Sequence, residues 1–172
     1  MTSLQGDVII AEWMKSLGIN TIEDDGSLVL KKILFEKQPL HFDFSAHPDL
    51  FPTMAATCAG LQLEARFTGV ANLSMKESDR VEAMKVELAK IGVEMFYVSE
   101  NEVVLRPSTD LPLFAKSNPL SFSAHADHRI VMALAPLSLK IGSVTFDTPE
   151  VVAKSYPDFW AKIAKIVPNI LV

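Results

Sequence analysis

Four basic side chains occur in three short polar stretches, each directly before or after an apolar segment. The stretches are residues 72–80, 127–129 and 154–159, and their basic residues are Lys76, Arg80, Arg129 and Lys154. Each stretch lies where a helix is expected to begin, and the free N–H groups of a helix N-terminus favour an anion. Arginine adds a bidentate fork and lysine a point charge, so the stretches predict a site for phosphate or carboxylate groups.

Several of these residues also have a purely structural interpretation. Glu77 lies three residues after Ser74, which is the spacing of a capping box, where its carboxylate would only bind a backbone N–H. Asp127 fits an acid that complements the dipole at the start of a helix. His128 fits a surface histidine in a first helical turn, and Lys154 fits a solvated loop lysine. Spacing alone leaves both interpretations open.

The sequence has no pattern for a metal site or for a known phosphate loop. Its histidines lack ligand spacing, and Cys58, the only cysteine, lies in an apolar run that favours a small core residue. His47 and His125 are interpreted as turn residues, with a catalytic role as the alternative. There is no Gly-rich phosphate loop and no Gly-x-Ser-x-Gly nucleophile motif.

Composition excludes several classes of protein. The 172 residues are 49% hydrophobic and 22% charged, as in an ordinary globular domain. A formal net charge of −5 argues against a nucleic-acid surface, and no apolar run approaches the length of a membrane span. One cysteine excludes an intrachain disulfide, and no export segment is evident, so we expect a cytoplasmic protein.

An internal repeat relates the charged stretches to one another. Phe44-Ser45-Ala46-His47-Pro48-Asp49 recurs 78 residues later as Phe122-Ser123-Ala124-His125-Ala126-Asp127. The same offset carries Lys76 onto Lys154, while residues 14–19 resemble residues 88–93 at an offset of 74. Equivalent positions in two copies of one unit would place Asp49, Asp127 and the lysines at one end of the domain.

Each copy predicts the same order of elements: a helix, two antiparallel strands, a third strand, a second helix and a last strand. The first helices carry apolar residues at helical spacing, and Gly18 and Gly92 follow them where a C-cap is expected. The strands of the two hairpins are expected at residues 20–23, 28–30, 94–98 and 103–105. The apolar run 130–139 predicts one helix, and residues 158–167 predict another that would begin a third copy.

This order predicts an α/β (α+β) fold of repeated βαβαββ-type units, with the helices packed inside and the sheets outside. The sequence begins almost at once with a helix, without a preceding strand for its hairpin to pair with. We therefore expect a fragment of a longer protein.

The motifs resemble those of one family, the EPSP synthases (3-phosphoshikimate 1-carboxyvinyltransferases). Lys76-Glu77-Ser78-Asp79-Arg80 is similar to their Lys-Glu-(Ser/Thr)-Asp-Arg signature, and Asp127-His128-Arg129 with the following Ile130-Val131-Met132 to their Asp-His-Arg-x-x-Met element. Pro48-Asp49 resembles their Pro-Asp helix start. The stretches 3–7 and 154–159 resemble the start and the close of their C-terminal half.

The resemblance implies transfer of the enolpyruvyl group of phosphoenolpyruvate (PEP) to the 5-hydroxyl of shikimate 3-phosphate, without metal or cofactor. It implies that Asp49 handles a proton at the attacking hydroxyl and Glu77 one at the PEP methylene carbon. The implied PEP-binding residues are Arg80, His128, Arg129 and Lys154. Those implied to contact shikimate 3-phosphate are Asp49, Asn72 and Lys76.

The resemblance also implies that residues 1–172 are a partial C-terminal domain whose partner, an N-terminal domain, is absent from this sequence. Two other classes stay open. UDP-N-acetylglucosamine enolpyruvyl transferases share the inside-out fold but lack the Lys-Glu-Ser-Asp-Arg signature. A folded domain that binds anions and turns over nothing is the second alternative.

Overall fold

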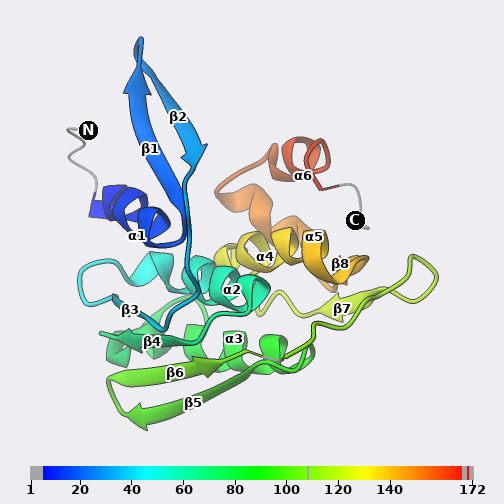
Figure 1. The fold of residues 1–172 in the computed structure, drawn as a ribbon. Helices are drawn as coiled ribbons and strands as arrows, with labels where there is room; N and C mark the ends of the chain where they lie inside the picture. The colour runs from blue at the N-terminus through cyan, green and yellow to red at the C-terminus, as the bar shows by residue number, and fades with distance from the viewer. Residues whose placement is uncertain (1–5, 108, 168–169, 171–172) are drawn as a thin grey trace.

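The computed structural model describes residues 6–107, 109–167 and 170, and its element order repeats along the chain (Figure 1). The first copy contains η1 (Gly6–Ile9), α1 (Ile10–Ser16), β1 (Ile19–Asp24), β2 (Ser27–Lys32), β3 (Leu40–Asp43), η2 (Pro48–Leu50), α2 (Phe51–Leu61), β4 (Ala65–Thr68) and η3 (Ala71–Met75). The second contains α3 (Arg80–Ala89), β5 (Glu94–Ser99), β6 (Glu102–Arg106), β7 (Leu120–Phe122), α4 (His128–Leu134), η4 (Ala135–Leu137), α5 (Ser138–Ile141), β8 (Val144–Phe146) and η5 (Pro149–Lys154), and α6 (Phe159–Ile163) follows.

The predicted order of elements is confirmed in both copies. Gly18 and Gly92 follow the first helix of each copy, just after the C-caps Leu17 and Lys90, with φ of 83° and 79°, a left-handed conformation that glycine adopts without a Cβ clash. The 3-10 helices η3 and η5 begin 78 residues apart, as the repeat requires. Part of the motif at residues 3–7 lies outside the described residues.

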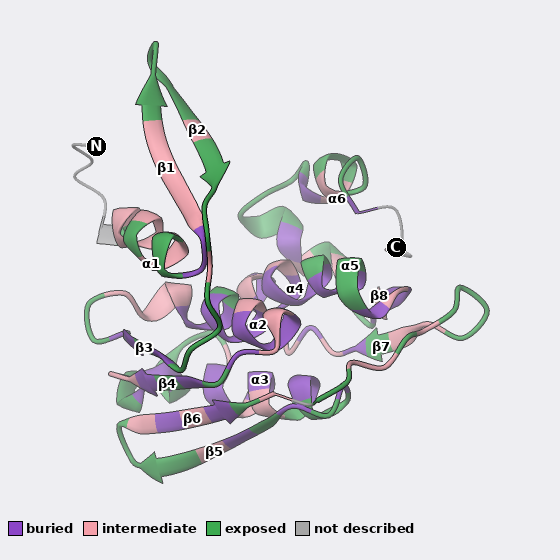
Figure 2. Ribbon diagram, in the orientation of Figure 1, coloured by how far each residue is buried: buried purple, intermediate pink, exposed green. Residues whose placement is uncertain are grey.

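The largest sheet joins strands from both copies, in the order β3-β4-β6-β5. β3 runs parallel to β4, with Leu40 opposite Ala65, and β6 runs antiparallel to β4, with Leu105 opposite the same Ala65. The described residues also form the two-stranded sheets β1-β2 and β7-β8. Buried and exposed residues alternate along β4, so one sheet face packs on the helices and the other faces solvent (Figure 2). The predicted arrangement of helices inside and sheets outside therefore describes this part of the molecule.

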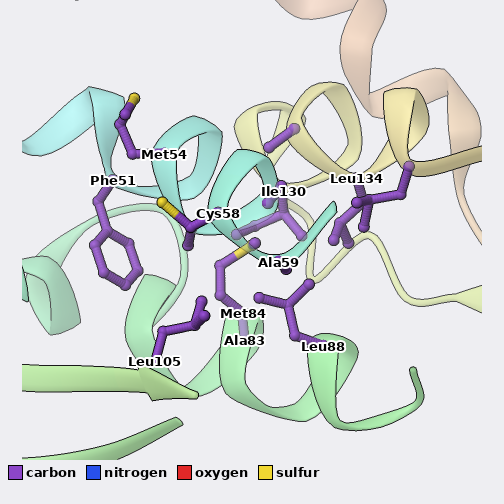
Figure 3. Close-up of a cluster of buried hydrophobic side chains, with 14 of the residues drawn as sticks. Phe51, Met54, Cys58, Ala59, Ala83, Met84, Leu88, Leu105, Ile130 and Leu134 are labelled. Carbon is purple, nitrogen blue, oxygen red and sulfur yellow. The ribbon is translucent and has the colours of Figure 1, made fainter. Parts of the chain in front are cut away.

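The core lies between α2, α3 and α4, which pack against one another above the sheet (Figure 3). Met84 and Leu88 of α3 meet Cys58 of α2 and Ile130 of α4, and all four are fully buried. Burial raises the pKa of the Cys58 thiol to about 12, so this side chain stays protonated and unreactive at neutral pH. The prediction that Cys58 is a core residue is confirmed.

Two predicted helices were too long. The single helix expected at 130–139 is broken into α4, η4 and α5, because Pro136 has no N–H to continue the ladder and its ring crowds the preceding turn. The helix expected at 158–167 ends at Ile163, and tighter turns follow, in which the Ile166 N–H bonds the Ile163 carbonyl at 2.9 Å.

The β1-β2 hairpin stands away from the body of the molecule (Figures 1 and 2). Leu28 and Leu30 lie on one face of β2 and are 57% and 69% exposed. The equivalent hairpin of the second copy, β5-β6, is instead held by β4. Equivalent sequence patterns therefore have unequal surroundings in the two copies.

Gly69 follows β4 in a left-handed conformation, with φ of 72°, against the start of the Ser-Ala-His turn. A Cβ here would meet the Ser45 backbone nitrogen and its hydroxyl, and both groups donate to Asp43 Oδ1, at 3.0 and 2.7 Å. The equivalent residue of the second copy is Asp147, whose own carboxylate accepts from Ser123 Oγ at 2.7 Å. The turn is thus held by an acid in both copies, but Asp43 is the last residue of β3, whereas Asp147 directly follows β8.

We expect Gly69→Ala to lower the free energy of unfolding by about 2–4 kcal/mol, because a methyl group against backbone adds to the cost of a left-handed alanine. Gly26→Ala is the matched control, since Gly26 has φ of 73° with nothing within 4 Å of its added Cβ. Gly26→Ala should lower the free energy of unfolding by only about 1 kcal/mol. Urea-induced unfolding measures both, and equal losses would show that close packing at Gly69 is unimportant.

Candidate active site

The guanidinium of Arg80 is the centre of the charged residues, and it is almost completely buried. Its side chain is 1% exposed, and each nitrogen binds a different carboxylate. Nη1 lies 2.6 Å from Asp49 Oδ1, Nη2 lies 2.8 Å from Glu77 Oε2 and Nε lies 2.9 Å from Asp127 Oδ2. A buried guanidinium needs such partners, because an unpaired charge would lose its hydration without compensation.

The three carboxylates come from three segments that end at the same place. Asp49 lies in η2, directly before α2, and Asp127 is the N-cap of α4. Glu77 lies in the loop between η3 and α3, and Arg80 is the first residue of α3. The N-terminal ends of α2, α3 and α4 therefore converge on one guanidinium, which confirms that the repeat brings Asp49 and Asp127 to one end of the domain.

Asp49 connects the buried arginine to the more exposed cations. Its Oδ1 atom binds Arg80 and lies 3.6 Å from Lys76 Nζ, while its Oδ2 atom lies 2.9 Å from Arg129 Nη2. The side chains of Asp49, Lys76 and Arg129 are each about one-third exposed. This outer part of the cluster is accessible to a small anion, whereas Arg80 is not.

Asp127 is the fully buried member of the cluster, and the sequence indicated only its role at a helix start. That role is confirmed, because Oδ1 accepts the backbone N–H of Arg129 at 2.9 Å. Its second oxygen also binds Arg80 and accepts a hydrogen bond from Ser78 Oγ at 3.2 Å. His128, 7% exposed, has its Nδ1 atom 3.9 Å from Asp127 Oδ1. Asp127 is part of the Asp-His-Arg motif, so the sequence did mark this residue, but its position at a helix start suggested only a capping role.

The arginines decide the pKa values of the two aspartates. Burial by itself raises the pKa of Asp49, but the hydrogen bond from Arg80 and the charges of Arg129 and Lys76 outweigh it, so the pKa is lowered. For Asp127, burial is again outweighed, here by Arg80, the Arg129 N–H and Ser78, and its pKa is also lowered. Both carboxylates are therefore ionised at neutral pH.

Two expected site residues have no polar side-chain contact with this cluster. The side chains of Lys154 and Asn72 are exposed and make no hydrogen bond or ion pair within residues 6–107, 109–167 and 170. The interpretation of His128 as a surface histidine is wrong, because its side chain is buried, and Arg80, one of the four cations of the predicted anion site, is buried as well. The predicted anion site describes Lys76 and Arg129 better, although both are paired with Asp49.

The capping-box interpretation of Glu77 is also wrong. α3 begins later than the box requires, and its N-cap is Asp79, whose carboxylate accepts the Glu82 N–H at 3.1 Å. Glu77 is left to bind Arg80 with a carboxylate that is 39% exposed. Its partner is a side chain rather than the backbone, so it belongs to the charged cluster.

The described residues contain no group of three or more acidic, histidine or cysteine side chains placed to hold a metal ion. Within the same residues, no helix has both the length and the apolar character needed to cross a bilayer. The arrangement can bind anions through Arg129 and Lys76. It can exchange protons through Asp49 and Glu77, whose carboxylates are 33% and 39% exposed.

Comparison with known proteins places this cluster in a family. The family model described as EPSP synthase (3-phosphoshikimate 1-carboxyvinyltransferase) matches residues 1–163, and these include every residue of the cluster. The chain belongs to the EPSP synthase family. UDP-N-acetylglucosamine enolpyruvyl transferases, the first alternative to it, therefore lose their support.

Relatives named 3-phosphoshikimate 1-carboxyvinyltransferase occur in bacteria and archaea. The Bacteroides fragilis protein is 36% identical over 95% of this chain and 39% of its own length. The Methanosarcina acetivorans protein is 32% identical over 95% of this chain and 36% of its own length. The chain thus spans about two-fifths of the length of these EPSP synthases.

A solved structure of the Acinetobacter baumannii EPSP synthase has the same fold. It matches 95% of this chain and 39% of its own chain with a TM-score of 0.66 and 22% sequence identity. This likeness confirms the α/β fold class.

We expect Arg80→Met to lower the free energy of unfolding by about 3–5 kcal/mol at neutral pH, because three carboxylates lose their common cation. In the wild-type chain Asp49 and Asp127 have lowered pKa values, so their contribution is present at neutral pH and is lost as the pH falls through them. In Arg80→Met the crowded carboxylates should instead have raised pKa values. Lowering the pH to about 5 should then restore part of the lost stability.

Urea unfolding at both pH values measures this reversal. Arg66→Met is the control, since Arg66 pairs with Glu102 on the outer face of the sheet and is 57% exposed. That substitution should cost less than about 1 kcal/mol and show no recovery in acid. If the free energy of unfolding lost in Arg80→Met did not depend on pH, the role of charge in the cluster would be contradicted.

We also expect Asp49→Asn to bind inorganic phosphate about fivefold more tightly than the wild-type chain, since the Asp49 carboxylate competes with an incoming anion for Arg129. Glu77→Gln is the matched control, because it removes one charge from the cluster but no contact with Arg129. NMR titration with phosphate gives both affinities. Weaker binding by Asp49→Asn would show that the aspartate supports the anion site rather than competing for it.

Proposed function

We propose that this chain supplies one wall of the active site that transfers the enolpyruvyl group of PEP to the 5-hydroxyl of shikimate 3-phosphate, releasing phosphate. The observation that carries the proposal is the convergence of Asp49, Glu77 and Arg129 around buried Arg80. Two acids and an accessible cation at helix N-termini suit a reaction between two polyanions. Family membership and the names of the relatives support the same reaction.

In this proposal the outer cations bind PEP. Arg129 is one-third exposed and presents a fork to a phosphate or carboxylate, while Lys154 would add positive charge and His128 a hydrogen-bond donor. Arg80 acts through its charge rather than by direct contact, since its nitrogens are occupied by carboxylates and its side chain is buried. Its positive charge raises the potential at the anion site, and it contacts PEP only if a carboxylate gives way.

Asp49 and Glu77 are the proton-transferring groups of the proposal. Asp49 would accept the proton of the attacking 5-hydroxyl, and Glu77 would deliver one to the PEP methylene carbon as the tetrahedral intermediate forms. The lowered pKa of Asp49 makes it a weak base in the free chain. If an anion draws Arg129 away, Asp49 loses one of its cations and becomes a stronger base when substrate is present.

Shikimate 3-phosphate would contact Asp49 and Lys76, which are each about one-third exposed, and the exposed Asn72. We assign the chain to the C-terminal domain of a two-domain enzyme, whose N-terminal domain would close over both substrates. The proportion of the relatives' length that the chain spans supports this assignment. A cytoplasmic location stays a prediction from the sequence.

A domain that binds anions without turnover is the second candidate. The pairing of Arg129 and Lys76 with Asp49 favours it for the chain by itself, because the cations are already partly neutralised. Both candidates share the anion site, and they differ in whether bound substrates react.

We expect the 172-residue chain alone to show no measurable phosphate release from PEP and shikimate 3-phosphate. One wall can neither hold both substrates in reacting contact nor shield them from water. Adding a separately produced N-terminal half of a relative should restore some activity if the two halves dock. A coupled phosphate assay measures both cases.

The control is the same mixture with Glu77→Ala, which should remain inactive because the proton donor is missing. Turnover by the chain alone that Glu77→Ala abolishes would show that one wall suffices. An active mixture that Glu77→Ala leaves unchanged would overturn the role of Glu77.

A further inference from the structure

Helix α3 holds the segment before α4 at two points, and only one of them is Arg80. The second is Glu87, two helical turns further along α3 and likewise 1% exposed. At 1.5 Å per residue the two side chains start about 10 Å apart along the helix. Arg80 binds Asp127, whereas Glu87 binds residues 123 and 125 of the same segment.

The carboxylate of Glu87 is fully used within its surroundings. Oε2 accepts the Ser123 backbone N–H at 2.9 Å and the ammonium of Lys90 at 2.6 Å. Oε1 lies 2.9 Å from Nε2 of His125. Burying a carboxylate is costly unless it is paired, and these contacts compensate for the burial of Glu87.

The segment that Glu87 holds has an unfavourable backbone. His125 and Ala126 have φ of 50° and 54°, and two consecutive left-handed residues that are not glycine cost free energy. The next residue is Asp127, followed by His128 and Arg129. The strained turn therefore sets the direction in which these residues enter the cluster.

The first copy shows that the fold does not require this acid. At the offset of 74 that relates Gly18 to Gly92, the residue equivalent to Glu87 is Trp13, and its ring packs edge-on against His47 with centroids 5.8 Å apart. The turn of the first copy contains no left-handed residue at 44–49. An aromatic contact thus suffices where the turn is unstrained, and the buried acid occurs where it is strained.

We propose that Glu87 is a positioning residue for the proposed reaction: through His125 and Ser123 it holds the strained turn that places Asp127 and Arg129. The proposal rests on the proposed function, because Arg129 is the expected anion contact. Glu87 itself contacts none of the expected substrate-binding residues, so its effect must pass through the turn.

The test is Glu87→Met in the full 172-residue chain, with amide hydrogen exchange and phosphate titration as readouts. The Ser123 amide loses its acceptor in Glu87→Met, so it should exchange faster whether or not Glu87 positions the turn. Positioning also requires faster exchange of the Arg129 amide, which is bonded to Asp127 and not to Glu87, by about tenfold. Phosphate affinity should fall about fivefold, and Glu87→Gln, which can still bond Ser123 and His125, should restore most of it.

Glu82→Met is the control, because Glu82 lies on the same helix, is 45% exposed and, within the described part of the chain, has Lys85 as its one side-chain partner. It should leave both readouts unchanged. If Glu87→Met fails to fold, His125→Asn decides, since asparagine tolerates the left-handed turn but cannot reach Glu87. Unchanged Arg129 exchange in the variant that folds would overturn the proposal. Absence of phosphate binding in the wild-type chain would overturn only the proposed function, because Arg129 exchange decides the positioning role separately.

Discussion

Burial of one guanidinium constrains the whole domain. Arg80 can lie 1% exposed only because three carboxylates surround it, and each belongs to a different segment of the chain. Satisfying the arginine therefore forces the starts of α2, α3 and α4 to meet. The apolar contacts of Met84 and Leu88 stabilise the same three helices further along their axes (Figure 3). Core packing and the charged cluster thus specify one arrangement together.

Because the buried arginine needs carboxylate partners, the cluster as a whole is neutral, and this neutrality limits which anions the cluster can bind. Lys76, Arg80 and Arg129 face Asp49, Glu77 and Asp127, so the positive charges of the free chain are already balanced. An anion gains affinity only by replacing a carboxylate at an accessible cation. That exchange is accessible to solvent at Arg129, which is one-third exposed, whereas Arg80 is buried. Binding an anion and changing the basicity of Asp49 are then the same event.

The sequence could predict the elements and most of the cluster but not their surroundings. Periodic apolar residues and glycine caps are local signals, so the element order and the capping role of Asp127 were confirmed. The pairing of β6 with β4 depends on contacts between copies, which no local pattern encodes. The break at Pro136 was in fact readable, since proline interrupts a helix, but the apolar run masked it. Burial of Arg80 could not be predicted from the sequence, because a charged residue is normally exposed.

The internal repeat explains why one arginine lies between two equivalent acids. Asp49 and Asp127 occupy the same position in the two copies, and each precedes or caps the second helix of its unit. Their surroundings then differ. Asp127 is fully buried, with one oxygen on a backbone N–H and the other on Arg80, so it is fixed. Asp49 is one-third exposed and bonded to cations that an anion can draw away. Two equivalent positions therefore hold one acid that is fixed in the cluster and one that is partly exposed to solvent.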